Sequence, residues 1–387
     1  MATSHNHKQA SDTLSFPLRP SAPLPKLIKM TEIKLADMFR EITKTVRGPF
    51  SCLACPAFAH LFSSKTRTDV YPAVSPSHGL AGAAKNLTGA VIITGSGRGI
   101  GRATAYAFAL AGAPKIVLTA RSSDELDEVE VLIKKDVDNI EVVKVVADVT
   151  REEDVHRVFE KAGEVEVLIN NAGAFGGVSR SRRLTKDVAS NDIHNFTAQD
   201  DCPVFSHQGT DLTQGTYLGT RELLRQIEAK PRAFPVTIIN TSSLAAALNF
   251  PQMSAYNASK SALNRFTELT HYENLDTVRA FAYHPGGVDT RMARDALGER
   301  FHQVPRDSTP ELAAGFSLWL ATKPEADFLS GRYVSCKWVC PFNFCDRAYL
   351  FIEAPGEQDV DELVAKKDEI ISEALLFTMI RGQEPLR

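Results

Sequence analysis

Three side chains of the sequence have the types and spacing to move a proton. Tyr256 and Lys260 stand four residues apart in the segment YNASK, and Ser243 precedes Tyr256 by 13 residues. Residues four apart on a helix lie one turn apart on the same face. An ammonium group beside a tyrosine stabilises the phenolate and lowers the tyrosine pKa from its ordinary value of about 10. The spacing therefore predicts Tyr256 as acid or base, Lys260 as the group that tunes it, and Ser243 as a hydrogen-bond donor to a substrate oxygen.

A glycine-rich segment, TGSGRGIG, has the pattern of a phosphate-binding turn. It directly follows an apolar, β-branched run and precedes a helical stretch at residues 102–111. Gly95 permits a tight turn, Gly99 lets the backbone approach a pyrophosphate, and Gly101 lets the helix pack closely on the strand. Free N–H groups and the positive dipole end at the start of the helix attract phosphate. The segment predicts a dinucleotide site, which also includes Ile100.

Two arginines indicate which dinucleotide binds. Arg121 follows the second β-branched run, where a site for NAD would usually place a carboxylate for the ribose 2′-hydroxyl. A guanidinium there suits a 2′-phosphate, and Arg98 within the glycine turn supplies a second cation. The sequence therefore predicts NADP(H) as the cofactor, with NAD(H) disfavoured. The alternative is that Arg121 is a solvated surface residue.

The elements that must position these residues are a series of short apolar runs, each followed by a helical stretch. The runs lie at 91–94, 115–120, 142–148, 165–171, 236–242, 278–284 and 331–336. Runs that are apolar on both faces and separated by helices are typical of a parallel sheet covered on both sides. The sequence predicts an α/β protein with a doubly wound Rossmann fold, in which a seven-stranded parallel sheet is flanked by helices. Ser243 then follows one strand directly, and Tyr256 opens the next helix.

The first 70 residues differ in composition from the rest. Four prolines lie among the first 25 residues, and prolines at that density remove helical hydrogen bonds. We predict that residues 1–70 form a poorly ordered N-terminal extension with one helix over 31–47, where apolar residues follow helical spacing. The Rossmann-type domain is predicted over 71–387.

Charge and hydropathy exclude several classes of function. The formal net charge of −3 gives no overall attraction to nucleic acid or to an anionic membrane. No apolar run approaches the ~18 residues that a membrane-spanning helix needs, and the N-terminus lacks the apolar core of a secretory signal. We expect no nucleic-acid partner, no membrane span and a cytoplasmic location.

The cysteines do not predict a metal site. Cys52 and Cys55 have the spacing of a redox motif or half a zinc site, but no second pair completes four ligands. We expect no metal. The alternative, a metal-binding or redox-sensing module at this pair, predicts bound zinc.

Six motifs, taken in order, resemble those of the short-chain dehydrogenase/reductase family. They are TGSGRGIG, Ala147-Asp148-Val149, NNAG at 170–173, Ser243, YNASK and PGGVDT at 285–290. The resemblance extends from about Tyr71 to the C-terminus and is strongest to the NAD(P)-dependent fungal members.

The resemblance implies a role for each matching residue. Tyr256 is implied as proton donor or acceptor, Lys260 as the residue that holds the nicotinamide ribose, and Ser243 as the residue that orients the carbonyl. The other implied cofactor contacts are Asp148 and Val149 at the adenine, Asn171 near the ribose, and Val288 and Thr290 at the carboxamide.

The implied reaction is hydride transfer between the nicotinamide and the carbon of a carbonyl or secondary alcohol. The substrate is expected to be a small molecule, with fungal secondary metabolism as the context. Family members usually pair through the helix that carries Tyr256 and the helix that follows Gly215, so we expect a homodimer or homotetramer.

One residue departs from the family pattern. The family usually has an asparagine three residues before the glycine of the NxxG helix, where it anchors a water that links the lysine to solvent. Here Leu212 stands three residues before Gly215. The alternative function is therefore a catalytically impaired protein that binds nucleotide without turnover.

Two segments, 178–214 and 339–358, have no counterpart in the family pattern, and we predict that both are insertions. A structureless loop as long as the first segment is uncommon in a compact domain. Both begin with valine and end with glutamine. Valine codons begin with GT and one glutamine codon is CAG, which match the ends of an intron. Our hypothesis is that both segments are translated introns, and the alternative is a genuine functional insertion such as a substrate lid.

Overall fold

The computed structural model describes residues 68–173, 207–247, 253–303, 306–337 and 367–372, together with Val360 and Val364. The predicted helix over 31–47, the Cys52 and Cys55 pair and most of the two predicted insertions lie outside these residues. Residues 207–214, at the end of the first predicted insertion, belong to a helix.

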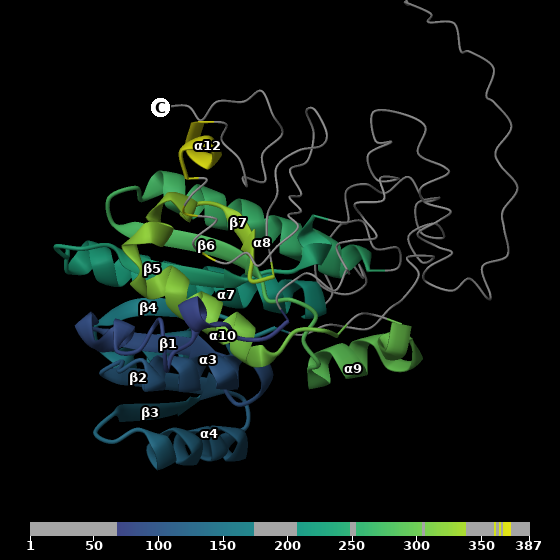
Figure 1. Ribbon diagram of the computed structural model, residues 1–387, viewed down its shortest axis with the longest axis horizontal. Helices are drawn as coiled ribbons and strands as arrows, with labels where there is room; N and C mark the ends of the chain where they lie inside the picture. The colour runs from purple at the N-terminus through teal and green to yellow at the C-terminus, as the bar shows by residue number, and fades with distance from the viewer. Residues whose placement is uncertain are drawn as a thin grey trace, which may run out of the picture. The chain divides into compact units, whose positions relative to one another are not determined.

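The described residues contain one sheet of seven parallel strands in the order β3-β2-β1-β4-β5-β6-β7 (Figure 1). The strands are Ala90–Thr94 (β1), Lys115–Ala120 (β2), Glu141–Val146 (β3), Val165–Asn170 (β4), Val236–Thr241 (β5), Val278–His284 (β6) and Tyr333–Ser335 (β7). The strand order reverses beside β1, as in doubly wound folds. The predicted Rossmann fold is confirmed, and every predicted strand end lies within two residues of the observed one.

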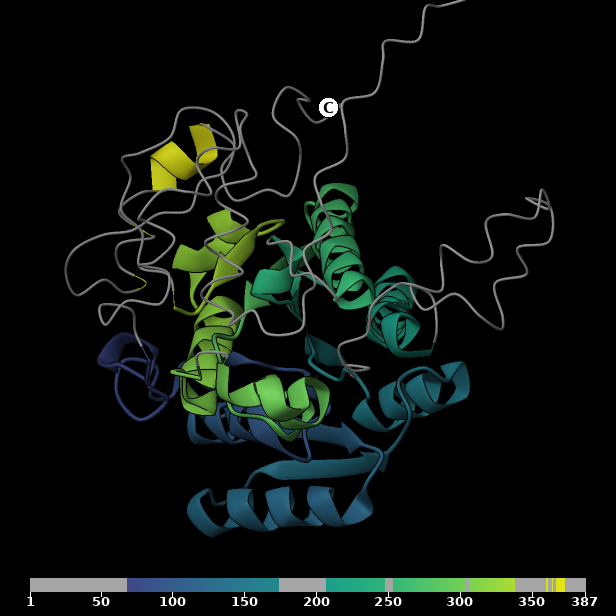
Figure 2. The ribbon, with the colours of Figure 1, turned by 90° about the vertical axis from the view of Figure 1, so that its right-hand side faces the viewer.

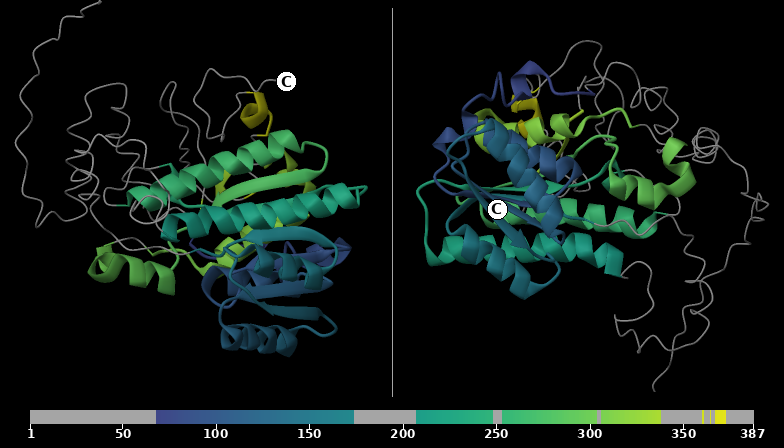
Figure 3. Two further views of the ribbon diagram at one scale, coloured as in Figure 1. Left: turned by 180° about the vertical axis from the view of Figure 1, so that it is seen from behind. Right: turned by 90° about the horizontal axis from the view of Figure 1, so that it is seen from below.

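Helices cover both faces of the sheet. The covering helices are α3 (Gly99–Leu110), α4 (Ser123–Asp136) and α10 (Pro310–Thr322) on one face, and α5 (Glu152–Ala162), α7 (His207–Ala229) and α8 (Ser254–Glu273) on the other. The structure also describes α9 (Arg291–Leu297) and α12 (Lys367–Ser372). One core contains side chains of α3, α4 and α10, and another contains side chains of α5 and α7. Figure 1 is seen from the side of α3 and α10, and the left panel of Figure 3 from the side of α7 and α8.

The central strands are buried on both faces because helices pack against their largely apolar side chains on each side. All residues of β1, β4 and β5 are buried. Successive side chains of a strand point to opposite faces, and accordingly Ile92 and Ile93 of β1 lie in different cores. This double burial holds the carboxyl ends of the strands in place.

The N-terminal part of the described chain packs on this domain. Tyr71, Val74 and Leu80 are buried in the same core as α10. Tyr71 directly precedes the short 3-10 helix η2 (Pro72–Val74), Val74 is its last residue, and Leu80 follows it. Tyr71, Val74 and Leu80 therefore contribute to the core of the domain.

The residues predicted to bind and react follow the strands at their carboxyl ends. In a parallel sheet these ends meet along one edge, where such folds bind ligands. Gly95 follows β1, Arg121 follows β2, and Ser243 follows β5 after one residue. Helix α9, which follows β6, faces the viewer in Figure 2. In the described part of the chain, no helix has the length and apolar character needed to cross a membrane.

Candidate active site

The glycine turn has the backbone shape that a phosphate-binding turn requires. Gly95 and Gly99 have φ values of 65° and 54°, in the left-handed region that favours glycine. A Cβ atom on Gly101 would lie 2.2 Å from the carbonyl oxygen of Gly95, so α3 packs against the turn at backbone distance. The Arg98 side chain, at the N-cap, does not cap α3. These features fit a dinucleotide whose phosphates approach the start of α3.

Hydrogen bonds from β4 hold the turn. The Asn171 Nδ2 atom donates to the carbonyl oxygens of Thr94 and Gly95, at 2.9 and 3.2 Å. The backbone N–H groups of Asn171 and Ala172 both donate to Oγ1 of Thr94, each at 2.9 Å. The Asn171 amide, expected near the cofactor ribose, is thus anchored to the glycine turn.

Arg121, Asp148 and Val149 lie at the ends of β2 and β3. Burial raises the pKa of the Asp148 carboxyl, but hydrogen bonds from Thr150 and the nearby charge of Arg121 lower it, and the net pKa lies below its ordinary value. A Cβ atom on Gly215 would lie 2.7 Å from Cγ2 of Val149, so α7 packs closely on this end of the site. Asp148 is therefore ionised beside the exposed Arg121 guanidinium.

Arg98 already has a protein partner. Its Nη1 atom lies 3.1 Å from Oε1 of Glu125, in the first turn of α4. Arg98, which the sequence predicts at a phosphate, is thus paired with Glu125, a residue that carries no sequence signal for this role. No local pattern shows this pair, because 27 residues separate its members.

Ser243, Tyr256 and Lys260 come together at the end of β5 and the start of α8. A side-chain hydrogen bond joins Ser243 and Tyr256. The Lys260 Nζ atom lies 5.8 Å from the centre of the Tyr256 ring and donates a 2.6 Å hydrogen bond to the carbonyl oxygen of Thr241. Lys260 is buried, with 5% of its surface exposed. The helical spacing therefore places Lys260 beside Tyr256, and Tyr256 reaches Ser243.

The pKa values of this group are governed by burial. Burial raises the pKa of Tyr256, and the hydrogen bond with Ser243 offsets this only in part. Burial also lowers the pKa of Lys260 to about 8. The sequence predicts a lowered pKa for Tyr256, whereas its pKa in the structure is raised, because removal from water disfavours the phenolate.

The peptide unit between Ser243 and Leu244 is held at both of its polar atoms. The Tyr333 hydroxyl of β7 donates to the Ser243 carbonyl oxygen at 3.0 Å. The Leu244 N–H donates to Nδ1 of His284, at the end of β6, at 3.2 Å. Burial and then the charge of Lys337 lower the pKa of His284 to about 3, so its ring is a neutral acceptor. We refer to Tyr333 and His284 as the Ser243 clamp.

Sequence reasoning missed both residues of the Ser243 clamp. His284 directly precedes the PGGVDT motif, and this position is the one sequence feature that could have indicated its place near the site. Tyr333 carries no such signal, because only the pairing of β7 with β6 brings it near Ser243.

Val288 and Thr290 lie in the loop between β6 and α9. Thr290 caps α9 by accepting a 3.1 Å hydrogen bond from the Ala293 N–H. Its Cγ2 atom would lie 3.5 Å from a Cβ atom on Gly99, which places this loop beside the glycine turn. Val288 is buried and forms a bridge with Ser308. The loop that carries Val288 and Thr290 thus lies beside the glycine turn.

Leu212 lies within α7, but its side chain is outside the described residues. Nearby, Gln214 Nε2 donates to the Thr150 carbonyl oxygen at 2.9 Å. This part of α7 is therefore attached to the loop after β3.

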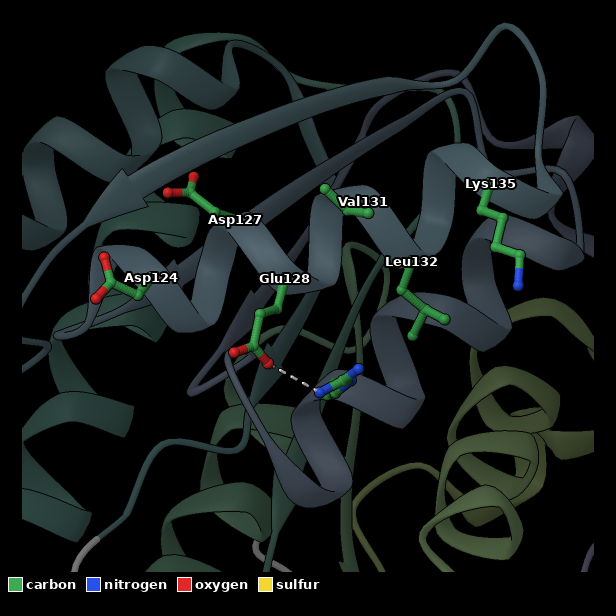
Figure 4. Close-up of a pocket in the computed structure, with 7 residues that line it drawn as sticks. Asp124, Asp127, Glu128, Val131, Leu132 and Lys135 are labelled. Atoms are coloured by element: carbon green, nitrogen blue, oxygen red, sulfur yellow. Dashed lines mark hydrogen bonds and ion pairs between the residues drawn. The ribbon is translucent and has the colours of Figure 1, made fainter.

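A separate groove lies between α3 and α4 (Figure 4). Its lining residues are Arg102, Asp124, Asp127, Glu128, Val131, Leu132 and Lys135. Arg102 Nη1 and Glu128 Oε2 are 3.4 Å apart across it. None of the predicted catalytic or cofactor residues lines this groove. Within the described residues, no group of three or more His, Cys, Asp or Glu side chains is arranged to hold a metal.

Comparison with known proteins identifies the family. The family model described as short chain dehydrogenase matches residues 89–300. Short chain dehydrogenase mpl6 of Monascus purpureus is 35% identical over 326 residues, which cover 82% of this chain and 95% of that protein. A short chain dehydrogenase/reductase of Claviceps purpurea is 30% identical over 318 residues, covering 81% of this chain and 91% of that protein.

A solved structure supports the same fold. It is a 3-ketoacyl-(acyl-carrier-protein) reductase from Brucella melitensis complexed with NADH, with a TM-score of 0.52 and 24% identity. The match covers 64% of this chain and 96% of that chain. Because the family model spans more than half of the sequence and the fungal relatives match over most of their length, the chain belongs to the short chain dehydrogenases, a family of oxidoreductases that use a nicotinamide cofactor.

Proposed function

We propose that this chain is an NADP(H)-dependent oxidoreductase that interconverts a carbonyl and a secondary alcohol. The observation that carries the proposal is the meeting of Ser243, Tyr256 and Lys260 at the end of β5, on the sheet edge that carries the glycine turn. Bound nicotinamide supplies the hydride in reduction or accepts it in oxidation.

Tyr256 transfers the proton that accompanies the hydride. In reduction its hydroxyl donates a proton to the carbonyl oxygen, and in oxidation its oxygen takes the proton from the alcohol. Ser243, hydrogen-bonded to Tyr256, donates to the same substrate oxygen as negative charge develops there. The Lys260 ammonium holds the nicotinamide ribose and favours the phenolate of Tyr256, which offsets the effect of burial.

The glycine turn and the neighbouring strand ends hold the cofactor. Gly95, Gly99, Ile100 and Gly101 receive the pyrophosphate at the start of α3. Arg121 and Arg98 receive the 2′-phosphate. The remaining contacts are Asp148 and Val149 at the adenine, Asn171 near the ribose, and Val288 and Thr290 at the carboxamide.

The test begins with binding and continues with turnover. Purified full-length chain is titrated with NADPH and with NADH while nicotinamide fluorescence is recorded. We expect tighter binding of NADPH, and an Arg121→Asp variant that loses this preference. A screen of ketones with NADPH, with Tyr256→Phe as the inactive control, then identifies the substrate class. Equal binding of the two nucleotides by the wild type would contradict the cofactor preference.

The second candidate is a nucleotide-binding protein without turnover. The residue that favours it is Leu212, which replaces the asparagine of the family's proton relay. Tight NADPH binding with no carbonyl reduction across the screen, and turnover restored by Leu212→Asn, would support this candidate.

We further propose a cytoplasmic enzyme of fungal secondary metabolism that acts on a small molecule as a homodimer or homotetramer. The context rests on similarity to fungal relatives. Association is supported by apolar side chains at the surface of α7 and α8, of which Tyr217 is 50% and Leu269 39% exposed.

A further inference from the structure

Glu125 places a carboxylate against the phosphate-binding turn from a neighbouring helix. It occupies the first turn of α4, where its N–H donates to the Ser122 N-cap hydroxyl. A Cβ atom on Gly97 would lie 2.8 Å from Cβ and 2.9 Å from Oε2 of Glu125. The carboxylate therefore fills the space that the missing Gly97 side chain leaves open.

The same space adjoins the end of β2. The Cβ atom on Gly97 would lie 3.5 Å from Cβ of Ala120, the last residue of that strand. A carboxylate at the end of this strand is what accepts hydrogen bonds from the ribose hydroxyls in sites for NAD. Here Ala120 and Arg121 provide no acid at the strand end, but Glu125 brings a carboxylate near it from α4.

Glu125 also pairs with one of the two arginines proposed for the 2′-phosphate. Its Oε1 atom lies 3.1 Å from Nη1 of Arg98, and the two side chains are 29% and 49% exposed. An ion pair that is this exposed contributes little to the stability of the fold, so its two side chains separate readily. Arg98 can therefore alternate between Glu125 and a bound phosphate.

We propose that Glu125 is a specificity-determining residue that limits the preference of this site for NADP(H) over NAD(H). The carboxylate repels a 2′-phosphate and competes with it for Arg98, whereas it accepts a hydrogen bond from the ribose hydroxyl of NAD(H). This inference rests on the proposed nicotinamide site, and it adds that the chain retains measurable affinity for NAD(H).

Glu125→Gln removes the charge and keeps the shape and length of the side chain. Glutamine also suits the third position of a helix that begins with a serine N-cap, so α4 should be retained. Glu128→Gln is the matched control, because Glu128 lies on the same helix and pairs with Arg102 at 3.4 Å, on the groove of Figure 4.

The measurement is the dissociation constant for NADPH and for NADH, by fluorescence titration of the full chain at low ionic strength. For Glu125→Gln we expect NADPH to bind about threefold to tenfold more tightly. The substitution removes one negative charge that repels the 2′-phosphate, and this repulsion is modest because the edge of the site is exposed to water. NADH binding should be unchanged or weaker. Glu128→Gln should leave both constants within about twofold, because Glu128 pairs with Arg102 and not with Arg98.

Unchanged NADPH affinity in Glu125→Gln, with an unchanged circular dichroism spectrum and Tm, would overturn the inference. An equal gain in Glu128→Gln would overturn it as well, since the effect would then be one of net charge. Failure of the proposed function looks different. A wild-type chain that prefers NADH, but gains NADPH affinity in Glu125→Gln, would contradict the NADP(H) preference while supporting the role of Glu125. Binding of neither nucleotide by any of the three proteins would overturn both.

Discussion

At the scale of single residues, burial is the main influence on the chemistry near Ser243. Lys260 is a buried lysine whose ammonium has a carbonyl oxygen, that of Thr241, as its hydrogen-bond acceptor. Desolvation lowers its pKa to about 8, which leaves it charged at neutral pH. A buried cation of this kind lowers the stability of the fold, and the chain retains it where the proposed mechanism needs a positive charge.

The depressed pKa of Lys260 predicts a pH-dependent difference in stability between the wild type and Lys260→Met. Between pH 8 and the ordinary lysine pKa of 10.5, the unfolded state binds more protons at this site than the folded state, so stability rises with pH. We subtract the free energy of unfolding of the variant from that of the wild type. This difference should increase by about 3 kcal/mol as the pH rises from 8 to 10.5. Urea unfolding of both proteins from pH 7 to 10.5 measures it, and a constant difference would contradict the burial of a charged Lys260.

The Ser243 clamp predicts a loss of rate without a loss of cofactor binding. Tyr333→Phe removes the hydroxyl that donates to the Ser243 carbonyl oxygen at 3.0 Å. We expect kcat for carbonyl reduction to fall by about tenfold, because a lost hydrogen bond of about 1 kcal/mol also frees Ser243, the proposed donor to the substrate oxygen, to move. The dissociation constant for NADPH should not change.

Tyr106→Phe is the control for this prediction. It removes a hydroxyl that donates to Asp136 at 2.8 Å, between α3 and α4. Both variants lose a tyrosine hydroxyl that donates a hydrogen bond, but only Tyr333→Phe should slow turnover. Equal rates in the two variants would show that the Tyr333 hydroxyl does not position Ser243.

At the scale of elements, the contact between β1 and α3 is the feature on which the proposed cofactor site depends. Strand and helix are joined by a turn with two left-handed glycines, and α3 approaches the turn at Gly101. The turn is held by Thr94 and Asn171, which link β1 to β4. The site is therefore built where the strand order reverses, and any side chain that parts α3 from the turn should damage it.

Gly101→Ala tests the contact between α3 and the turn. The added Cβ atom would lie 2.2 Å from the Gly95 oxygen and 2.6 Å from Nδ2 of Asn171, so the turn must open. We expect NADPH affinity to fall at least about tenfold and Tm to fall by several degrees, as for other overpacking substitutions. Ala103→Ser, on a partly exposed position of α3, should change neither. Normal binding by Gly101→Ala would contradict the proposed cofactor site.

At the scale of the whole molecule, the sheet edge collects residues from six strand ends, while the helices carry the surfaces available for association. α7 and α8 lie side by side, and the Tyr217 and Phe266 rings are 6.0 Å apart between them. Tyr217 and Leu269 remain exposed on these helices. An apolar face of this kind suits a second copy of the chain packed about a two-fold axis.

This surface predicts that the chain associates through α7 and α8. We expect light scattering after gel filtration to give the mass of a dimer or tetramer, and the double variant Tyr217→Asp with Leu269→Asp to give a smaller species. Val131→Asp is the control, because Val131 is 69% exposed but lies on α4. A wild-type monomer, or an unchanged mass for the double variant, would contradict the prediction.

The sequence by itself determined the local features of this protein. It determined the strand positions and the parallel sheet, because β-branched runs buried on both faces leave a pattern in consecutive residues. It also identified the glycine turn, whose φ values only glycine adopts readily, and the helical spacing of Tyr256 and Lys260.

Only the tertiary structure decided which distant residues meet and which groups leave water. It paired Arg98 with Glu125, brought His284 and Tyr333 to the two ends of one peptide unit, and gave Tyr256 a raised pKa. None of these features leaves a periodic pattern. Each depends on burial and on contacts between separate strands and helices, which exist only once the sheet has formed.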